Sequence, residues 1–439
     1  MDADKMRTLT LGIAARTEYI QVVTQFVEST AAVFGMKKEE LLKLNLATEE
    51  IFLYLCNFVC SGKALEVQCY NGFYYTSVLF RFSAVELNLS GLNIASKITP
   101  DREPDLDTMG LLIASRSVDH FNIVVEKNNQ VSLTVTKEKA YPEFSEIIPV
   151  PQSAEKIFIE TPDAERLKYL AALVSQLYDP ARRPAFFSYP GKLVDMVASG
   201  DYNAIVALNS KKEVIGGILY CFRTEKNVQC FGPYYFCGEQ EKVICETLLA
   251  DCLSKIARTK ALGLLSLSGL PESMHNNFEI LGSLRYNEDG KAPVDEFSFY
   301  RLLHEDPGFE VWSSDNLKEY LSGEYNRLAL AREIRTIRDM GETRSGSSLF
   351  SADVDRNRNS VSLRPLLPGN DYSSNIDRHV HFLRDDGFLN IHFELDLGIP
   401  WHAELIPILI NHNFKPTIIL PFAGKSDNVI FEYNNETRS

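Results

Sequence analysis

Histidine side chains, which can bind metal ions through their ring nitrogens, are concentrated near the end of this 439-residue sequence. Five of the eight histidines are His379, His381, His392, His402 and His412. His379 and His381 would share a face on a strand, but the surrounding residues predict a helix, where positions two apart diverge. No cysteine or carboxylate completes a set with metal-ligand spacing. We therefore expect no metal site.

The segment LPFAGKSDN, residues 420–428, contains the glycine, lysine and serine types of a phosphate-binding loop. A P-loop, however, has the spacing GxxxxGK(S/T) and joins a strand to a helix. Here the spacing differs, and both flanking segments predict strands. We expect a hairpin loop.

The elements that must position such residues alternate between strands and helices, which predicts an α/β (α+β) architecture. In a first domain, 1–140, the predicted strands are 8–14, 64–70, 74–82, 121–125 and 130–136, and the predicted helices are 19–34, 37–59 and 109–118. The segment 141–154 carries three prolines and no helical period, so it predicts a linker.

A second domain is predicted at 155–304. It has a strand from residue 156, helices 164–178 and 190–198, strands 204–208, 214–223 and 227–236, a helix 239–260, a strand 263–268, a helix 273–281 and closing strands to 303. A third domain, 305–439, opens with a predicted helix, 316–338. Its later elements repeat the order of 228–303, so we infer a degenerate internal duplication.

The run LNLATEEIFLYLCNFV, residues 44–59, resembles the magnesium-binding helix of the GHKL ATPase superfamily, especially its anti-sigma-factor kinases. In that family a glutamate orients the attacking water or hydroxyl, and an asparagine one turn later ligates magnesium. The resemblance makes Glu50 a candidate catalytic residue. Tyr54 stands at the asparagine position, and Asn57 is the candidate substitute one turn further along.

A glycine that receives phosphates at a helix N-terminus corresponds to Gly110 in DTMGLLIASRSVDHFNI. The family's adenine-binding Asp-x-Gly-x-Gly loop is missing, and the acidic segment DREPDLD at 101–107 would repel phosphates. The resemblance therefore implies a GHKL-like α/β sandwich that contacts a protein partner. We do not expect it to bind ATP and magnesium tightly or to hydrolyse ATP.

The element order of 155–304, together with FGPYYFCGEQEKVICETLLADCLSKIA at 231–257, resembles the GNAT acyltransferases. Their mixed sheet is splayed between its fourth and fifth strands, and the splay admits the pantetheine arm of acetyl-CoA. A loop at the start of the next helix binds the pyrophosphate through backbone amides.

The GNAT resemblance implies four candidate residues for binding acetyl-CoA, which are Gly232, Tyr235, Gly238 and Glu239. Of these, Gly238 matches the glycine of the family's loop. Glu239 also suits the dipole of any helix N-terminus, which is the structural alternative.

Many GNAT enzymes protonate the departing thiolate with a tyrosine four residues before a glycine in the last helix. This sequence has Phe278 at that place, before Gly282, and Leu409 in the C-terminal copy. Tyr286 and Tyr234 are the alternatives, although each also has a structural interpretation. Tyr286 is the second candidate catalytic residue.

Composition restricts the partners and the compartment. The chain carries a net charge of -14, and no stretch combines lysine and arginine with aromatic residues, so we expect no nucleic-acid partner. The longest strongly apolar run, 51–60, is about half of the ~20 residues that span a membrane. The N-terminus lacks the pattern of a signal peptide, and the eight cysteines form no regular framework. We expect a cytoplasmic protein with reduced, buried cysteines.

Two functions agree with these features. The first is an acyl-CoA-dependent N-acyltransferase with a degenerate ATPase-like regulatory domain. The second is a non-catalytic protein of bacterial signalling, built from degenerate ATPase-like and acetyltransferase-like modules. A third hypothesis, an anti-sigma-like kinase, requires magnesium ligation that the phenol of Tyr54 does not supply.

Overall fold

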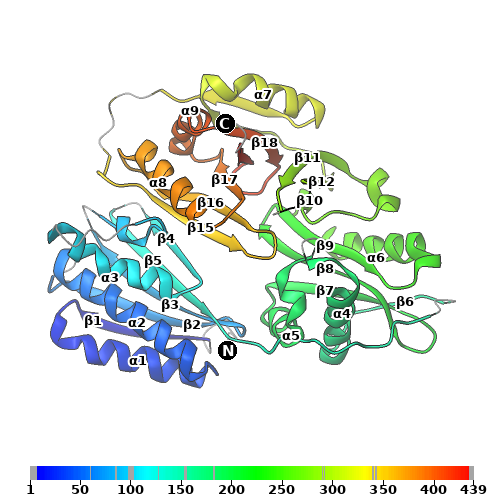
Figure 1. Ribbon diagram of the computed structural model, residues 1–439, viewed down its shortest axis with the longest axis horizontal. Helices are drawn as coiled ribbons and strands as arrows, with labels where there is room; N and C mark the ends of the chain where they lie inside the picture. The colour runs from blue at the N-terminus through cyan, green and yellow to red at the C-terminus, as the bar shows by residue number, and fades with distance from the viewer. Residues whose placement is uncertain are drawn as a thin grey trace. The chain divides into compact units, whose positions relative to one another are not determined.

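The computed structural model describes residues 7–59, 61–84, 87–96, 103–126, 128–152, 156–180, 183–288, 290, 292–338, 341 and 344–434, with the backbone alone for 103–108. Cys60, residues 153–154 of the predicted linker and the acidic side chains at 101–107 therefore lie outside the described residues. The architecture is mixed α/β, as expected (Figure 1). The chain divides into two compact units. One comprises 1–140, 340–353 and 363–386, and the other comprises 141–339, 354–362 and 387–439.

The first unit contains an antiparallel five-stranded sheet of order β1-β2-β3-β5-β4. Its strands are β1 (Thr8–Ala14), β2 (Ala64–Asn71), β3 (Tyr75–Ser83), β4 (His120–Val125) and β5 (Gln130–Glu138). Alternate side chains, including Val67, Val78, Phe80 and Leu133, are fully buried and share one core with three helices. These are α1 (Ile20–Val33), α2 (Lys38–Tyr54) and α3 (Glu103–Ser117), which lie side by side in Figure 1.

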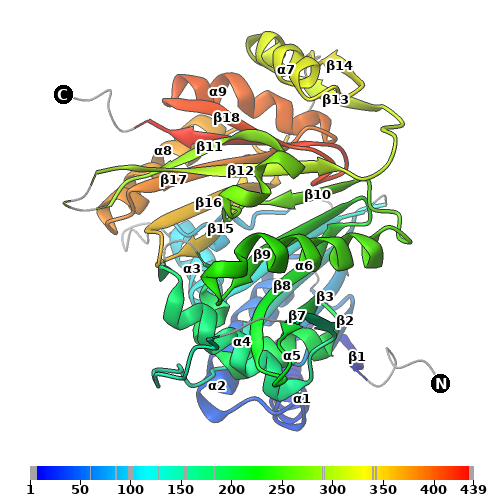
Figure 2. The same cartoon turned by 90° about the vertical axis from the view of Figure 1, so that its right-hand side faces the viewer.

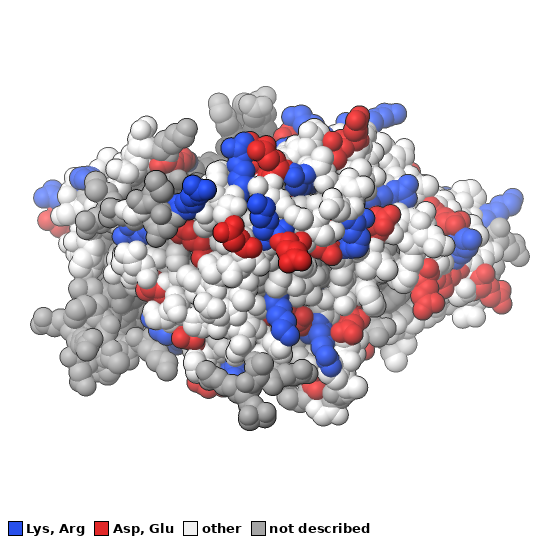
Figure 3. All heavy atoms as spheres, turned by 90° about the horizontal axis from the view of Figure 1, so that it is seen from above, with Lys and Arg blue, Asp and Glu red and all other residues white. Residues whose placement is uncertain are grey.

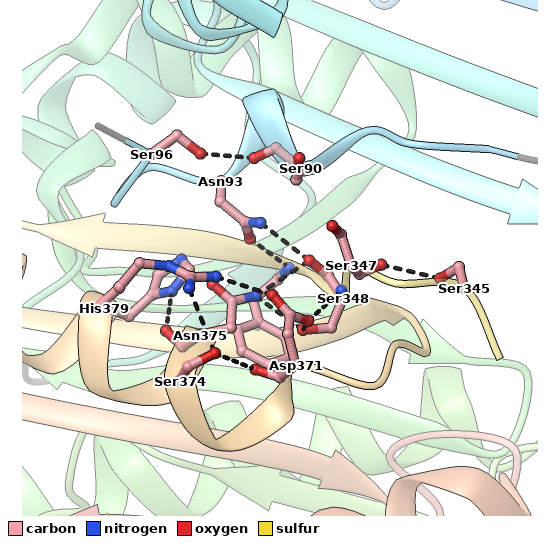
Figure 4. Close-up of polar contacts among 12 residues, drawn as sticks. Ser90, Asn93, Ser96, Ser345, Ser347, Ser348, Asp371, Ser374, Asn375 and His379 are labelled. Atoms are coloured by element: carbon pink, nitrogen blue, oxygen red, sulfur yellow. Dashed lines mark hydrogen bonds and ion pairs between the residues drawn. The ribbon is translucent and has the colours of Figure 1, made fainter. Parts of the chain in front are cut away.

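A buried polar cluster joins the N-terminal part of this unit to its later segments (Figure 4). Asn93 Nδ2 donates to the carbonyl O of Ser348 at 3.0 Å, and its Oδ1 accepts from the N–H of Phe350 at 3.0 Å. Asp371 Oδ1 accepts from the N–H and the hydroxyl of Ser348, and Asn375 Nδ2 donates to the same residue. The amide of Asn93 thus bonds to the backbone as a neighbouring strand would, and it links residue 93 to residues 348–350.

The second unit contains a seven-stranded sheet of order β11-β12-β10-β9-β8-β7-β6. The strands are β6 (Phe158–Glu160), β7 (Tyr202–Leu208), β8 (Val214–Thr224), β9 (Asn227–Tyr235), β10 (Gly263–Ser266), β11 (Glu279–Tyr286) and β12 (Val294–Leu302). Neighbouring strands are antiparallel except β9 and β10, which are parallel. Counted from β6, the parallel pair is the fourth and fifth strands, as the GNAT resemblance implies.

Helices cover both faces of this sheet (Figure 2). One face packs against α4 (Ala164–Leu177) and α5 (Pro190–Ser199), and the other packs against α6 (Glu241–Ile256). The glycine pair in β8 allows this close approach. A Cβ on Gly216 would lie 2.7 Å from Ile244 of α6, and one on Gly217 would lie 2.6 Å from Leu170 of α4. The two glycines therefore permit close packing of a helix on each face of the sheet.

The last sheet has the order β15-β16-β17-β19-β18. Its strands are β15 (Leu349–Asp355), β16 (Ser360–Leu367), β17 (Asn390–Asp396), β18 (Phe414–Leu420) and β19 (Asn428–Tyr433), with α8 (Tyr372–Asp385) before β17 and α9 (Leu405–Asn411) before β18. This order corresponds strand by strand to β8-β9-β10-β12-β11, and α8 corresponds to α6. The segment 420–428 is a hairpin loop between the antiparallel β18 and β19, as predicted.

Two predicted helices are wrong. The helix expected at 316–338 ends at Arg327 as α7 (Asp315–Arg327), because Ala329 adopts a left-handed φ of 52°, and the chain continues as β14 (Arg332–Thr336) beside β13 (Phe309–Ser313). The helix expected at 273–281 is a short 3-10 turn followed by β11. Pairing of β11 with β12 overrides the local helical pattern there.

The second unit also contains a buried ion pair and a close contact between two edge strands. Arg332 on β14 is fully buried and binds Asp427 with two hydrogen bonds, of 2.6 and 3.1 Å, and also Asp306. The strands β11 and β18 lie side by side, and a Cβ on Gly282, where β11 bulges, would lie 2.9 Å from the carbonyl O of Thr417.

Among the described residues, seven cysteines are free thiols and six of them are buried. None of the helices in the described part of the chain combines the length and the apolar character that crossing a bilayer requires.

Candidate functional site

The unit-two sheet opens between β9 and β10. The two strands pair over four residues, from Asn227 opposite Gly263 to Cys230 opposite Ser266. Strand β10 then ends, whereas β9 continues to Tyr235. Five residues of β9 therefore have no β10 residue beside them, which is the splay expected from the GNAT resemblance.

A bulge in β9 lies just beyond the end of its pairing with β10. The register with β8 shifts between Phe231 and Tyr234, so Gly232 and Pro233 stand opposite the single residue Ile218. Gly232 has a φ of +90°, and a Cβ there would lie 2.7 Å from the N of Tyr234. Pro233 has no N–H to offer a neighbouring strand. Gly232, a predicted coenzyme-binding residue, thus has a conformational role in the bulge.

A residue that the sequence analysis did not select fills part of the splay. The hydroxyl of Tyr178, which follows α4, accepts from the N–H of Tyr235 at 2.9 Å and donates to its carbonyl O at 3.1 Å. Burial raises the pKa of Tyr178 well above its usual range. The phenol satisfies two backbone groups that would otherwise be open on the β9 edge.

The start of α6 lies directly after this edge. A 3-10 turn, Gly238–Gln240, leads into the helix, and no side chain caps its N-terminus. Gly238 has open space where a Cβ would stand, and Glu239 is exposed. The carboxylate of Glu241 accepts from Ser273 at 3.0 Å. The N–H groups of Gln240 and Glu241 are bonded within this turn, to the carbonyl O atoms of Cys237 and Gly238. Any phosphate at the start of α6 would also have to compete with two carboxylates.

Tyr235 projects toward the same helix. Burial, and then its hydrogen bond to Glu241, raise the pKa of the Tyr235 phenol. The structure therefore brings three of the predicted coenzyme residues, Tyr235, Gly238 and Glu239, to one end of the splay.

Tyr286, the candidate catalytic acid of this sheet, lies away from the splay. Tyr286 ends β11, and β12 and β10 stand between β11 and β9. Its ring packs against His392 at a centroid distance of 5.8 Å and against the guanidinium of Arg358 at 5.4 Å. Burial raises the pKa of Tyr286. These contacts agree with the structural interpretation of Tyr286, in which its ring packs against neighbouring side chains.

The acid position that the GNAT resemblance implies, four residues before a glycine on one helix, is not formed in this structure. Phe278 and Gly282 were expected on one helix, but Phe278 precedes β11 and Gly282 lies in its bulge. Positions four apart on a strand do not have the geometry of one helical turn. Leu409 does lie on a helix, α9, and is fully buried.

In the first unit, Gly110 lies inside α3, which begins at Glu103, so the expectation that it stands at a helix N-terminus is wrong. Gly110 instead lies close to Glu50 of α2. A Cβ on Gly110 would lie 2.4 Å from Oε2 of Glu50, so the carboxylate packs against α3. Burial, and then the charge of Glu49, raise the pKa of Glu50. The hydroxyl of Tyr54 donates to the carbonyl O of Asn88, and burial raises its pKa to about 12.

Asn57 lies in a π-helical turn, Leu55–Val59, and its side chain is exposed. The expectation that Asn57 shares the face of Glu50 assumed a regular α-helix. A π turn holds more residues per turn, so that seven-residue spacing does not return to the same face.

Within the described residues, no three His, Cys, Asp or Glu side chains gather closely enough to hold a metal ion. Three of the late histidines, His379, His392 and His402, are instead buried, and burial lowers their pKa values to about 4, 4 and 3. On the face seen in Figure 3, basic and acidic side chains are interspersed.

Comparison of the sequence with protein-family models and with curated proteins found no match. Similar solved structures include an N-acetyltransferase from Staphylococcus aureus Mu50, with 14% identity, a TM-score of 0.29 and coverage of 34% of this chain and 100% of that chain. An aminoglycoside 6'-N-acetyltransferase complexed with coenzyme A has 12% identity and a TM-score of 0.28, over 34% of this chain and 99% of that chain. The aminoglycoside 6'-N-acetyltransferase from Enterococcus faecium has the same four values. The GNAT-like fold of the seven-stranded sheet is evident from its own strand order and splay.

Proposed function

We propose that residues 155–304 bind acyl-CoA at the splay between β9 and β10 and transfer the acyl group to an amine. The observation that carries this proposal is the β9 edge at 231–235, which extends beyond β10 and runs toward the N-terminus of α6. A pantetheine arm carries amide groups, and an open strand edge offers the matching N–H and C=O groups.

In this proposal the coenzyme displaces one side chain. The hydroxyl of Tyr178 now holds the N–H and C=O of Tyr235. A pantetheine amide that bonds the same groups must take the place of the phenol. Tyr178 therefore competes with acyl-CoA and weakens its binding.

The test is a calorimetric titration of the protein with acetyl-CoA. We expect micromolar binding, which corresponds to about -8 kcal/mol. In Tyr178→Phe the competing hydroxyl is absent. We expect acetyl-CoA to bind about 5- to 30-fold more tightly, since each of the two hydrogen bonds of the hydroxyl contributes roughly 1 kcal/mol net. Tyr169→Phe, an exposed tyrosine of the same helix, is the matched control and should bind as the wild type does.

A second function is favoured by a different observation. Glu239 and Glu241 place negative charge in the first turn of α6, where the coenzyme phosphates would lie. If neither acetyl-CoA nor magnesium ATP binds in the titration, the protein is better described as a non-catalytic regulatory binding protein.

For the first unit we propose a regulatory role, in which a degenerate ATPase-like domain binds a protein partner. The support is Tyr54, whose buried hydroxyl is engaged with Asn88 at the position that would ligate magnesium. Phosphorylation of an added protein that appears in Tyr54→Asn would instead support a kinase origin with an intact nucleotide site.

A further inference from the structure

Arg183, in the connection between α4 and α5, is a buried arginine without an acidic partner. Its residue surface is 5% exposed. Its Nη1 donates to the hydroxyl of Ser188 at 2.9 Å, and its Nε donates to the carbonyl O of Tyr178 at 3.3 Å. Both acceptors are neutral. Among the described residues, no carboxylate lies within ion-pair distance of this guanidinium.

Two other arginines of the same unit have guanidinium groups that are largely shielded from solvent, and both are paired with acids. The fully buried side chain of Arg332 binds Asp427 and Asp306, and the side chain of Arg358, which is 14% exposed, binds Glu296 at 3.0 Å. A buried charge without a partner is costly, because desolvation is not offset by an opposite charge.

The electrostatic surroundings of Arg183 do not remove that cost. Burial lowers the pKa of Arg183, whereas Tyr234, Glu143 and Asp179 act in the opposite direction. Glu143 and Asp179 are exposed, and neither forms an ion pair with Arg183. An anionic ligand would supply the charge that these groups do not.

The position of Arg183 indicates which anion. It is bonded to Tyr178, whose hydroxyl lies at the splay and whose ring packs edge-on against Tyr234 at 4.9 Å. The hydroxyl of Tyr234 is buried and has no hydrogen-bond partner in the described part of the chain. Tyr234 belongs to the core on the α4 and α5 face, opposite α6. An anion at Arg183 is therefore separated by the sheet from phosphates bound at the start of α6.

We propose that Arg183 binds the carboxylate of the acyl acceptor, so that the acceptor is an amino acid with a free amine and a free carboxylate. The assignment of this anion as an acceptor rests on the proposed acyltransferase function. The guanidinium presents planar paired donors, which match a carboxylate. The amine of the bound acceptor attacks the thioester carbonyl carbon, a C–N bond forms and the C–S bond breaks. The proton lost by the amine balances the coenzyme A thiolate, which leaves as the thiol.

The alternative is a purely structural Arg183 that caps the end of α4 through the carbonyl O of Tyr178. The two roles differ in what substitution changes. A structural role affects stability alone, whereas a binding role affects the choice between charged and neutral acceptors.

The experiment follows release of the coenzyme A thiol from acetyl-CoA, with each L-amino acid compared with its own C-terminal amide. We expect the wild type to prefer one or more free acids over the matching amides by about 10- to 100-fold in kcat/KM, the value of hydrogen bonds to a charged group. Arg183→Gln should lose this preference while its acetyl-CoA affinity stays within twofold of the wild type. Arg183→Lys, which keeps the charge, should retain part of the preference.

Equal use of acids and amides by the wild type, or an undiminished preference in Arg183→Gln, would overturn the assignment even if acetyl-CoA binds. Failure to bind acetyl-CoA is a separate result that counts against the acyltransferase. In that case the same L-amino acids are titrated directly by calorimetry. Binding that Arg183→Gln abolishes supports a carboxylate site, and absence of binding to the wild type refutes it.

Discussion

Acidification from pH 7 to pH 5 is expected to destabilise the second unit through His402, which binds a proton in the unfolded chain but not in the folded state. Its ring is buried, and its Nδ1 accepts a hydrogen bond from the N–H of Asp396 at 3.1 Å. The Nδ1 lone pair is therefore occupied in the folded state. Burial, and then the charge of Lys425, lower the pKa of His402 to about 3.

The magnitude follows from proton linkage. In the unfolded chain the histidine has its ordinary pKa of about 6.5, so it binds a proton as the pH falls to 5, whereas the folded state does not. The folded pKa is depressed, so stability is lost as the pH falls through 6.5 toward 3. Between pH 7 and pH 5 the loss is about 2 kcal/mol for this residue. Because the folded pKa lies well below pH 5, the loss of stability between pH 7 and pH 5 is set almost entirely by the pKa of the unfolded chain.

The assay is urea unfolding at both pH values, followed by tryptophan fluorescence. Both tryptophans, Trp312 and Trp401, belong to the second unit, so the signal reports the unit that contains His402. In His402→Asn the amide Oδ1 can accept the same hydrogen bond but does not titrate. We expect the variant to lose about 2 kcal/mol less than the wild type on acidification.

His304, which is exposed, provides the control, and His304→Asn should follow the wild type. An equal loss of stability in His402→Asn and the wild type would refute the reasoning. The buried His392 remains in every variant and contributes in the same direction, so the comparison rests on the difference between variants.

Three further predictions concern a buried ion pair, a close packing contact and a pair of buried hydrogen bonds. Asp427→Ala leaves the buried Arg332 without its two-point partner and should lower the unfolding free energy by about 3 to 5 kcal/mol in the same fluorescence assay. Gly217→Ala places a Cβ within 2.6 Å of a leucine on α4 and should cost about 1 to 3 kcal/mol, whereas Gly238→Ala, which points into open space, should not destabilise by this route. Asn93→Ala removes two buried hydrogen bonds to the backbone at the start of β15, one to Ser348 and one to Phe350. Amide hydrogen exchange of residues 344–353 should therefore be faster in this variant than in the wild type.

Much of the fold was predictable because long segments carry a clear period. Most strands of the seven-stranded sheet, such as β8, follow from their apolar periodicity. The helix expected at 273–281 is wrong, because the residues from Glu279 onward form strand β11, which depends on pairing with β12. Local sequence carries no record of that partner.

The candidate site was predictable only in part. The resemblance located Tyr235 and Gly238 near the splay, because the residues that follow a strand and begin a helix are visible in the sequence. Tyr178 and Arg183 were missed. Tyr178 matters because of its hydrogen bonds to Tyr235, which lies over fifty positions away, and Arg183 because it is buried without an acidic partner. Neither property has a spacing pattern in the sequence.

The close approach of β11 and β18 has a consequence for how the protein can be divided. Each is the last strand of its own sheet, and such a strand offers unpaired backbone groups to any other extended chain. Here each shields the other, with Gly282 against Thr417. Cutting the chain between the two sheets would expose both strands to solvent, so we expect the separated parts to self-associate. The five-stranded sheet that ends in β18 thus covers an edge of the seven-stranded sheet, whatever ligand either of them binds.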